Sequence, residues 1–246
     1  MSRAVLLTKA DPLFMGHILT ELLEQGCSTA MVFAEPGEAG SCMDRVPERH
    51  RERFFPLWGR PTDEEGIRAV VDQAASRMGR LDVLIHGVEA WDEEAGYDLD
   101  PLEFGLNTAA ELRNRFLYSR AAAAHMARAK SGQIWFLLLA DSLYSAGYPS
   151  SPVLNQGTIG LMKTLAKELS PFRVAVNAVT YGYYAVPDER VDKKELRQRL
   201  EIHALKPYLP APQEMAAASV DWLLRVPERL VSGQNIHFGA GLDTGV

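Results

Sequence analysis

The segment SGQIWFLLLA, residues 131–140, decides the fold class of this chain. Residues 134–140 form a continuous apolar run, which is long enough for a strand and far too short to cross a bilayer. Because every position in the run is apolar, both faces of the strand are expected to be buried. That is typical of a parallel sheet covered by helices, so the segment predicts an α/β protein.

Strand-like and helix-like segments alternate on both sides of this run. The expected strands are short and apolar, at residues 5–7, 29–33, 53–57, 81–85, 133–139, 174–179 and 234–238. The expected helices carry apolar residues at helical spacing, at residues 17–25, 63–77, 106–130, 153–169 and 212–224. Thr62 and Glu65 have the spacing of a capping box at the start of the second helix. This alternation predicts a doubly wound parallel sheet of about seven strands with helices on both faces.

Length and composition agree with a single globular domain over residues 1–246. The chain is 47% hydrophobic and has a formal net charge of −6, which excludes disorder of the bulk of the chain. The acidic balance argues against a nucleic-acid partner bound through overall charge. Residues 181–212, the least regular stretch, are expected to form an insert over the carboxyl ends of the strands.

The cysteines, the histidines and the N-terminal residues indicate the compartment of the chain and whether a metal site is expected. Cys27 and Cys42 are too few for a disulfide framework, which fits a reducing cytoplasm. No signal peptide or membrane span is expected, because no apolar stretch is long enough. The histidines lack metal-ligand spacing, so no metal site is expected. The acidic residues between positions 89 and 100 are expected to form a surface loop or to contact a partner.

Several short motifs, in this order and at these spacings, resemble the short-chain dehydrogenase/reductase superfamily. The motifs are GRLDVLI at 79–85, SGQI at 131–134, GTIGL at 157–161, VAVNAV at 174–179 and SGQ at 232–234. The resemblance covers nearly the whole chain and implies a Rossmann-like sheet. It also implies a nicotinamide cofactor at the carboxyl ends of the strands, and a catalytic serine, tyrosine and lysine.

The positions that the resemblance assigns to the cofactor depart from the family pattern. The family's glycine-rich loop after the first strand cradles the pyrophosphate, but here residues 8–16 read TKADPLFMG. Bulky side chains at the glycine positions are expected to fill that space, so no cofactor is expected in this chain. Lys9 holding an anion and Glu35 accepting ribose hydroxyls stay open as alternatives. The degenerate cofactor positions are Lys9, Leu13, Met15, Gly59 and His86.

The catalytic positions implied by the resemblance are also changed. Leu139 stands at the serine position, Ser151 at the tyrosine position and Asn155 at the lysine position. Glu111 stands at the position of the helix asparagine that completes the family's proton relay. A serine hydroxyl without a neighbouring lysine cannot be tuned towards neutral pH. No catalytic residue of the family pattern is therefore expected.

These departures favour a pseudoenzyme as the leading hypothesis. The chain would pair with an active dehydrogenase subunit that carries the NAD(P), through helices 106–130 and 153–169, in a hetero-tetramer or dimer. Gly157, Gly160 and Ala166 would permit the close approach. This situation resembles heteromeric family members with one degenerate subunit, such as the benzylsuccinate-pathway hydroxyacyl-CoA dehydrogenase, and implies an acyl-CoA as a candidate substrate.

Two alternatives remain open from the sequence. The chain could be a divergent but active NAD(P)-dependent oxidoreductase, in which Tyr144 or Tyr148 replaces the catalytic tyrosine. It could also be a cofactor-independent protein that binds a ligand in the cleft under residues 181–212, with Trp91, Tyr181, Tyr183 and Tyr184 lining a pocket. For those tyrosines, packing of the insert is an equally good explanation.

Overall fold

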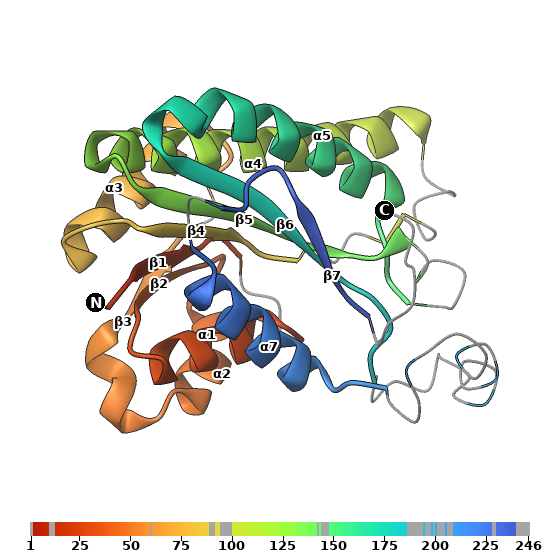
Figure 1. Ribbon diagram of the computed structural model, residues 1–246, viewed down its shortest axis with the longest axis horizontal. Helices are drawn as coiled ribbons and strands as arrows, with labels where there is room; N and C mark the ends of the chain where they lie inside the picture. Colours follow the sequence, from red (N-terminus) through yellow and green to blue (C-terminus); the bar gives the residue numbers. More distant parts are fainter. Residues whose placement is uncertain are drawn as a thin grey trace.

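A single sheet of seven parallel strands runs through the structure (Figure 1). The structure, a computed structural model, describes residues 2–9, 13–59, 61–88, 92–93, 100–141, 143, 148–185, 194, 198, 200, 205, 209–227 and 230–239. The strand order is β3-β2-β1-β4-β5-β6-β7, and every neighbouring pair is parallel. The predicted doubly wound sheet is thus confirmed. The strands are β1 Ala4–Leu7, β2 Ser28–Phe33, β3 Phe54–Trp58, β4 Val83–His86, β5 Gly132–Leu139, β6 Val174–Tyr181 and β7 Asn235–Phe238.

Helices cover both faces of the sheet, as Figure 1 shows. On one face α1 Met15–Glu24, α2 Pro36–Arg45 and α7 Pro212–Arg225 pack over the sheet. On the other face lie α3 Glu64–Met78, α4 Pro101–Ala129 and α5 Pro152–Leu169. Two 3-10 helices, η1 Glu48–Arg53 and η4 Ser170–Phe172, precede β3 and β6.

The central strands explain why the two helical layers form. All eight residues of β5 and all eight of β6 are buried. Successive side chains of a strand point to opposite faces, so Trp135 enters the core under α1 and α7, while Phe136 enters the core under α4 and α5. The apolar run at 134–140 therefore supplies both hydrophobic cores, as predicted.

The structure corrects three details of the expected elements. Helix α2 was not predicted, because its segment PGEAGSCMDR presents little apolar surface beyond the buried Ala39 and Cys42. The cap of α3 is Asp63, whose Oδ1 accepts a hydrogen bond from Gly66 N at 2.9 Å, and not Thr62. Helix α4 begins at Pro101, capped by Asp100, which accepts from Leu102 N at 2.7 Å.

The order of strands reverses between β1 and β4. In an open α/β sheet, such a switch point leaves a crevice at the carboxyl ends of the two strands, where ligands bind. The insert expected at 181–212 lies largely outside the described residues. In the described part of the chain, no helix is both long and apolar enough to cross a membrane.

Candidate functional site

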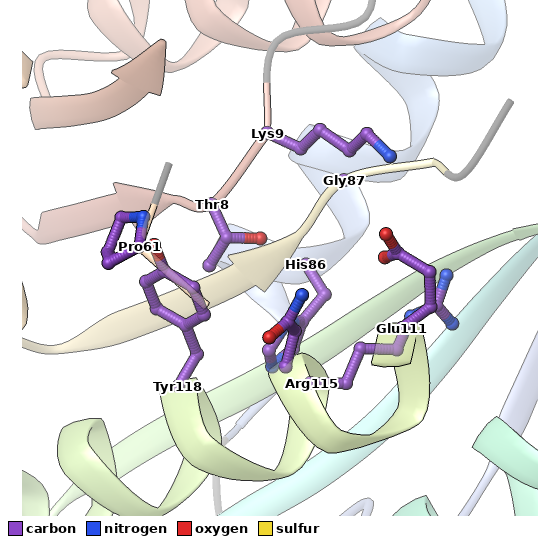
Figure 2. Close-up of a pocket in the computed structure, with 9 residues that line it drawn as sticks. Thr8, Lys9, Pro61, His86, Gly87, Glu111, Arg115 and Tyr118 are labelled. Atoms are coloured by element: carbon purple, nitrogen blue, oxygen red, sulfur yellow. The ribbon is translucent and has the colours of Figure 1, made fainter. Parts of the chain in front are cut away.

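A pocket opens at this switch point, at the carboxyl ends of β1 and β4 (Figure 2). It is small, with room for water-sized molecules in about 40 Å³. Residues from the ends of both strands, from α4 and from the segment before α3 line it: Thr8, Lys9, Pro61, His86, Gly87, Glu111, Asn114, Arg115 and Tyr118. The fold therefore brings together three positions singled out from the sequence, namely Lys9, His86 and Glu111.

A buried arginine forms part of the pocket wall. Arg115 is only 5% exposed, and its Nη1 donates to Thr158 Oγ1 on α5 at 2.6 Å. Thr158 Oγ1 in turn donates to Leu154 O at 2.7 Å. Burying a guanidinium costs free energy unless its N–H groups are hydrogen-bonded. The bond from Arg115 to Thr158 supplies one such hydrogen bond and joins α4 to α5 at the site. The sequence analysis missed Arg115, because its partner lies 43 positions away.

Glu111 lies one helical turn before Arg115. Residues four apart share one face of a helix, so both side chains rise from α4 towards the pocket. Figure 2 shows the Lys9 side chain extending past Gly87 from the end of β1, above the Glu111 carboxylate. Glu111 is partly buried. The pocket thus combines one carboxylate with two cationic side chains.

His86 forms the floor of the pocket at the end of β4. Its ring stacks on Phe136 with centroids 4.5 Å apart, and its Nε2 lies 2.9 Å from Ser119 Oγ. Burial, and secondly the positive charge of Arg115, hold the pKa of His86 well below its usual range. The imidazole is therefore neutral at neutral pH and adds no charge to the pocket.

The side chains expected to fill the cofactor loop point elsewhere. Met15 is fully buried in the core under α1, and Leu13 packs against the same core. Phe14 is also fully buried, where its ring stacks on Tyr181 with centroids 4.5 Å apart. Of the three residues that replace glycines, only Lys9 lines the pocket.

Gly87 allows β1 and β4 to end close together. A Cβ at this position would lie 2.9 Å from Lys9 Cβ and 3.1 Å from Lys9 O. Any larger residue would push the Lys9 backbone out of the pocket wall. The glycine therefore fixes where the Lys9 side chain enters the site.

Two other positions that the resemblance singled out follow strand ends and do not line the pocket. Gly59 follows β3 with a positive φ of 97°, and its N donates to Phe33 O at 3.1 Å. Its positive φ suits a glycine at this turn. Glu35 follows β2 and is exposed, and its side chain makes no capping bond to α2. Its carboxylate can accept hydrogen bonds from hydroxyl groups.

At the start of α5, the positions of the family's tyrosine and lysine are engaged in structural contacts. Asn155 Nδ2 donates to Leu139 O at 2.6 Å and to Asp141 Oδ1 at 2.8 Å. Gln156 Nε2 donates to Asp141 Oδ2 at 2.9 Å. Ser151 is the buried N-cap residue of α5. The Asn155 amide therefore joins the start of α5 to the end of β5.

Glu93 was expected in a surface loop, and that prediction is wrong. It is 4% exposed, and its carboxylate accepts from Val153 N at 2.9 Å and from Leu154 N at 3.0 Å. Its own N donates to Ser150 O at 3.1 Å. A carboxylate at a helix N-terminus satisfies free N–H groups and complements the helix dipole. Glu93 thus ties the segment before α4 to the start of α5.

Tyr148, one of the two tyrosines considered as replacements, is bonded inside the core. Tyr148 is 2% exposed, and its hydroxyl donates to Tyr184 O at 2.9 Å. Burial, and secondly Tyr183, raises the pKa of Tyr148 to about 12. Tyr181 and Tyr184 pack against Phe14 in the core. Tyr144 and Trp91 lie outside the described residues.

Comparison with known proteins shows to which family the chain belongs. The family model described as enoyl-(acyl carrier protein) reductase matches residues 17–243. The chain is a short-chain dehydrogenase/reductase. It is 23% identical over 246 residues to the 3-oxoacyl-[acyl-carrier-protein] reductase FabG of Staphylococcus aureus, covering 98% of both chains. It is also 23% identical to nodulation protein G of Azospirillum brasilense, covering 92% of both.

Solved structures of this superfamily share the fold. YwfH, described as an NADPH-dependent reductase involved in bacilysin biosynthesis, superposes with a TM-score of 0.79 at 17% identity, covering 100% of both chains. Levodione reductase superposes with a TM-score of 0.79 at 20% identity, covering 97% of this chain and 96% of its own.

The comparisons overturn two predictions from the sequence, the pseudoenzyme subunit and the absence of a cofactor. The matching family model is described as a reductase, and the Staphylococcus aureus relative matched over 98% of both chains is a 3-oxoacyl-[acyl-carrier-protein] reductase. The physical reason lies in the loop before α1. The prediction assumed that Leu13 and Met15 fill the pyrophosphate space, whereas both side chains turn into the core.

Proposed function

We propose that this chain is itself an NAD(P)-dependent oxidoreductase that interconverts a carbonyl compound and an alcohol. The observation that carries the proposal is the polar, cation-lined pocket at the switch point between β1 and β4. The relatives support the reaction class, because they include a 3-oxoacyl reductase and levodione reductase. An acyl thioester or a cyclic ketone is accordingly the substrate class to test first.

The residues of the pocket fit a nucleotide. Thr8 supplies a hydroxyl and Lys9 an ammonium group, both at the end of β1 beside the start of α1. The first turn of α1 carries no acidic residue, so its positive end favours phosphate. Glu35 offers a carboxylate to ribose hydroxyls at the end of β2. When bound, the cofactor supplies the hydride.

Lys9 is the residue that we expect to bind the diphosphate of the nucleotide. Lys9 is one of the two cationic side chains that line the pocket, and it extends from the end of β1. Its ammonium group bonds to the diphosphate in place of the backbone N–H groups of a glycine-rich loop. This mode of binding depends on charge and should weaken as salt concentration rises.

Binding of NADPH and NADH to the purified chain tests the proposal. We expect saturable binding by calorimetry, and NADPH oxidation in the presence of a 3-oxoacyl thioester or levodione. Lys9→Met should weaken nucleotide binding about tenfold or more, because a charge-assisted bond is lost. Lys167→Met, on the exposed face of α5, is the matched control and should bind normally. If neither nucleotide binds to the unmodified chain, the proposed function is wrong.

We also propose a cytoplasmic setting and a second copy of the chain as its partner. Cys27 and Cys42 are both free and buried, which suits a reducing compartment. Leu102, Leu106 and Phe116 of α4 and Val153 of α5 are exposed apolar side chains. Such residues on neighbouring helices suit burial against another subunit.

A further inference from the structure

Cationic side chains lie at the amino ends of three neighbouring strands, at the edge of the sheet opposite the pocket (Figure 1). Arg3 directly precedes β1 and Arg53 is the last residue before β3. Gly26 and Cys27 come directly before β2, which pairs with both of those strands. Because the amino ends of parallel strands lie at the same edge of a sheet, the topology brings these residues together.

The guanidinium groups of Arg3 and Arg53 both act on Cys27. Burial raises the pKa of the Cys27 thiol, whereas the positive charges of Arg3 and Arg53 act in the opposite direction. Arg53 also lies beside Gly26, because a Cβ on this glycine would be 3.4 Å from Arg53 Nη1. Positive charge is therefore concentrated where β1, β2 and β3 begin.

The 3-10 helix η1 adds a histidine and another arginine, and we call Arg49, His50 and Arg53 the η1 cluster. His50 is only 8% exposed, and its two ring nitrogens face different arginines. Its Nε2 lies 3.0 Å from Arg49 Nε, and its Nδ1 lies 2.6 Å from Arg53 Nη2. A neutral imidazole has one nitrogen that can accept a hydrogen bond, and an imidazolium has none. His50 can therefore satisfy only one of the two guanidinium groups at a time.

Carboxylates do not balance the charge of the η1 cluster. Arg53 is half-buried and forms no ion pair with any residue that the structure describes. Arg49 Nη2 lies 3.8 Å from Glu24 Oε1, but the two side chains are 71% and 46% exposed, so this contact contributes little stability. A guanidinium group that is shielded from water needs hydrogen bonds and an opposite charge. The η1 cluster thus has an excess of donors and of positive charge.

We propose that the η1 cluster is a binding site for a phosphate group, either free phosphate or the phosphate of a small monoester. The N–H groups of arginine form charge-assisted hydrogen bonds to phosphate oxygens, often two at a time. A phosphate held by Arg49 and Arg53 accepts from the guanidinium group that His50 cannot satisfy. The Arg49 side chain is exposed, so the ligand can approach it from solvent.

This site is separate from the proposed nucleotide pocket. It lies at the opposite edge of the sheet, so its existence does not depend on the oxidoreductase function. The chain has a formal net charge of −6, which repels anions from the molecule as a whole. Phosphate binding therefore requires a local concentration of positive charge, and the few side chains of the η1 cluster should account for it.

Calorimetric titration of the purified chain with inorganic phosphate, near neutral pH and at constant ionic strength, tests the proposal. We expect a saturable site that persists in Lys9→Met, in which a cation of the nucleotide pocket is removed. Arg49→Gln and Arg53→Gln, each combined with Lys9→Met, should weaken binding about tenfold or more, because charge-assisted bonds are lost. Arg68→Gln, on the exposed side of α3, removes the same charge elsewhere and should bind normally.

A local measurement reports on the cluster itself. Addition of phosphate should shift the NMR signal of the His50 Cε1 proton, which is assigned by its absence from the spectrum of His50→Asn. Titration with glycerol phosphate then distinguishes the two sources of the ligand. Tighter binding of the ester indicates a phosphorylated metabolite, and tighter binding of inorganic phosphate indicates the free ion.

Absence of phosphate binding in Lys9→Met would refute the site, as would equal affinities in the Arg49, Arg53 and Arg68 variants. If Arg53→Gln does not fold, Arg49→Gln decides the question, because Arg49 is exposed. With Lys9 intact, Arg49→Gln should bind NADPH as the unmodified chain does. A chain that binds phosphate at the η1 cluster but does not bind NADPH would contradict the proposed function alone.

Discussion

His86 is buried on β4 between the ring of Phe136 and the Ser119 hydroxyl, and its pKa is held well below the usual value by burial and by Arg115. In the unfolded chain the pKa of a histidine is about 6.5. The unfolded state therefore binds more protons than the folded state in mildly acidic solution. The stability that His86 contributes is present above about pH 6.5 and is lost as the pH falls below it.

The variant His86→Asn tests this pH dependence. The free energy of unfolding of the unmodified chain should fall between about pH 6.5 and pH 5, by up to about 1.4 kcal/mol per pH unit from this residue. The free energy of unfolding of the variant should depend less steeply on pH, by that amount. Urea unfolding over the pH range measures both, and His237→Asn, on the exposed side of β7, should keep the original slope. Parallel profiles for all three proteins would contradict the burial of a neutral His86.

At the scale of elements, the start of α5 depends on a residue outside the helix. The first turn of α5 contains no acidic side chain, and its N-cap Ser151 makes no capping bond. The Glu93 carboxylate instead accepts from the N–H groups of Val153 and Leu154. The Glu93 backbone N also donates to Ser150 O, so this residue is bonded to the start of α5 through both its side chain and its main chain.

Replacing Glu93 with glutamine keeps its size and removes its charge. Glu93→Gln should lower the free energy of unfolding by about 1–3 kcal/mol, because a charge-assisted pair of hydrogen bonds is weakened in a buried site. Glu168→Gln, an exposed carboxylate near the other end of α5, is the control and should cost nothing. Denaturant unfolding of the two variants measures the difference, and equal midpoints would show that Glu93 does not stabilise the helix.

The same elements show what a sequence can predict and what it cannot. The strands β5 and β6 are apolar throughout, so a local pattern sufficed to predict them and the sheet they belong to. Helix α2 has too few apolar residues to produce such a pattern. The contacts of Glu93 with α5 and of Arg115 with Thr158 join positions far apart in the chain. No local spacing encodes these contacts, so neither of them could be predicted from the sequence.

At the scale of the whole molecule, the proposed pairing with a second copy concerns the exposed surface of α4 and α5. The sequence suggested that Gly157, Gly160 and Ala166 permit close approach between subunits. In the structure Gly157 faces Leu112 of α4, where a Cβ would lie 2.9 Å from Leu112 Cδ1, and Ala166 is buried in the core. Only Gly160 is exposed, with no atom within 4 Å of a Cβ placed on it. Gly160 is therefore the position at which a second copy can approach α5.

Gly160→Arg should separate subunits without harming the fold. Light scattering should give the unmodified chain a mass of twice 27.2 kDa or a higher multiple, and the variant a mass of 27.2 kDa. Arginine favours a helix over glycine by about 0.8 kcal/mol, so the separated variant should keep a well-formed α5. Gly157→Val should do the opposite, because it overpacks the contact with Leu112. It should cost about 1–3 kcal/mol of stability and leave the mass unchanged. A chain that is monomeric without any substitution would show that the exposed face of α4 and α5 does not bind a second copy.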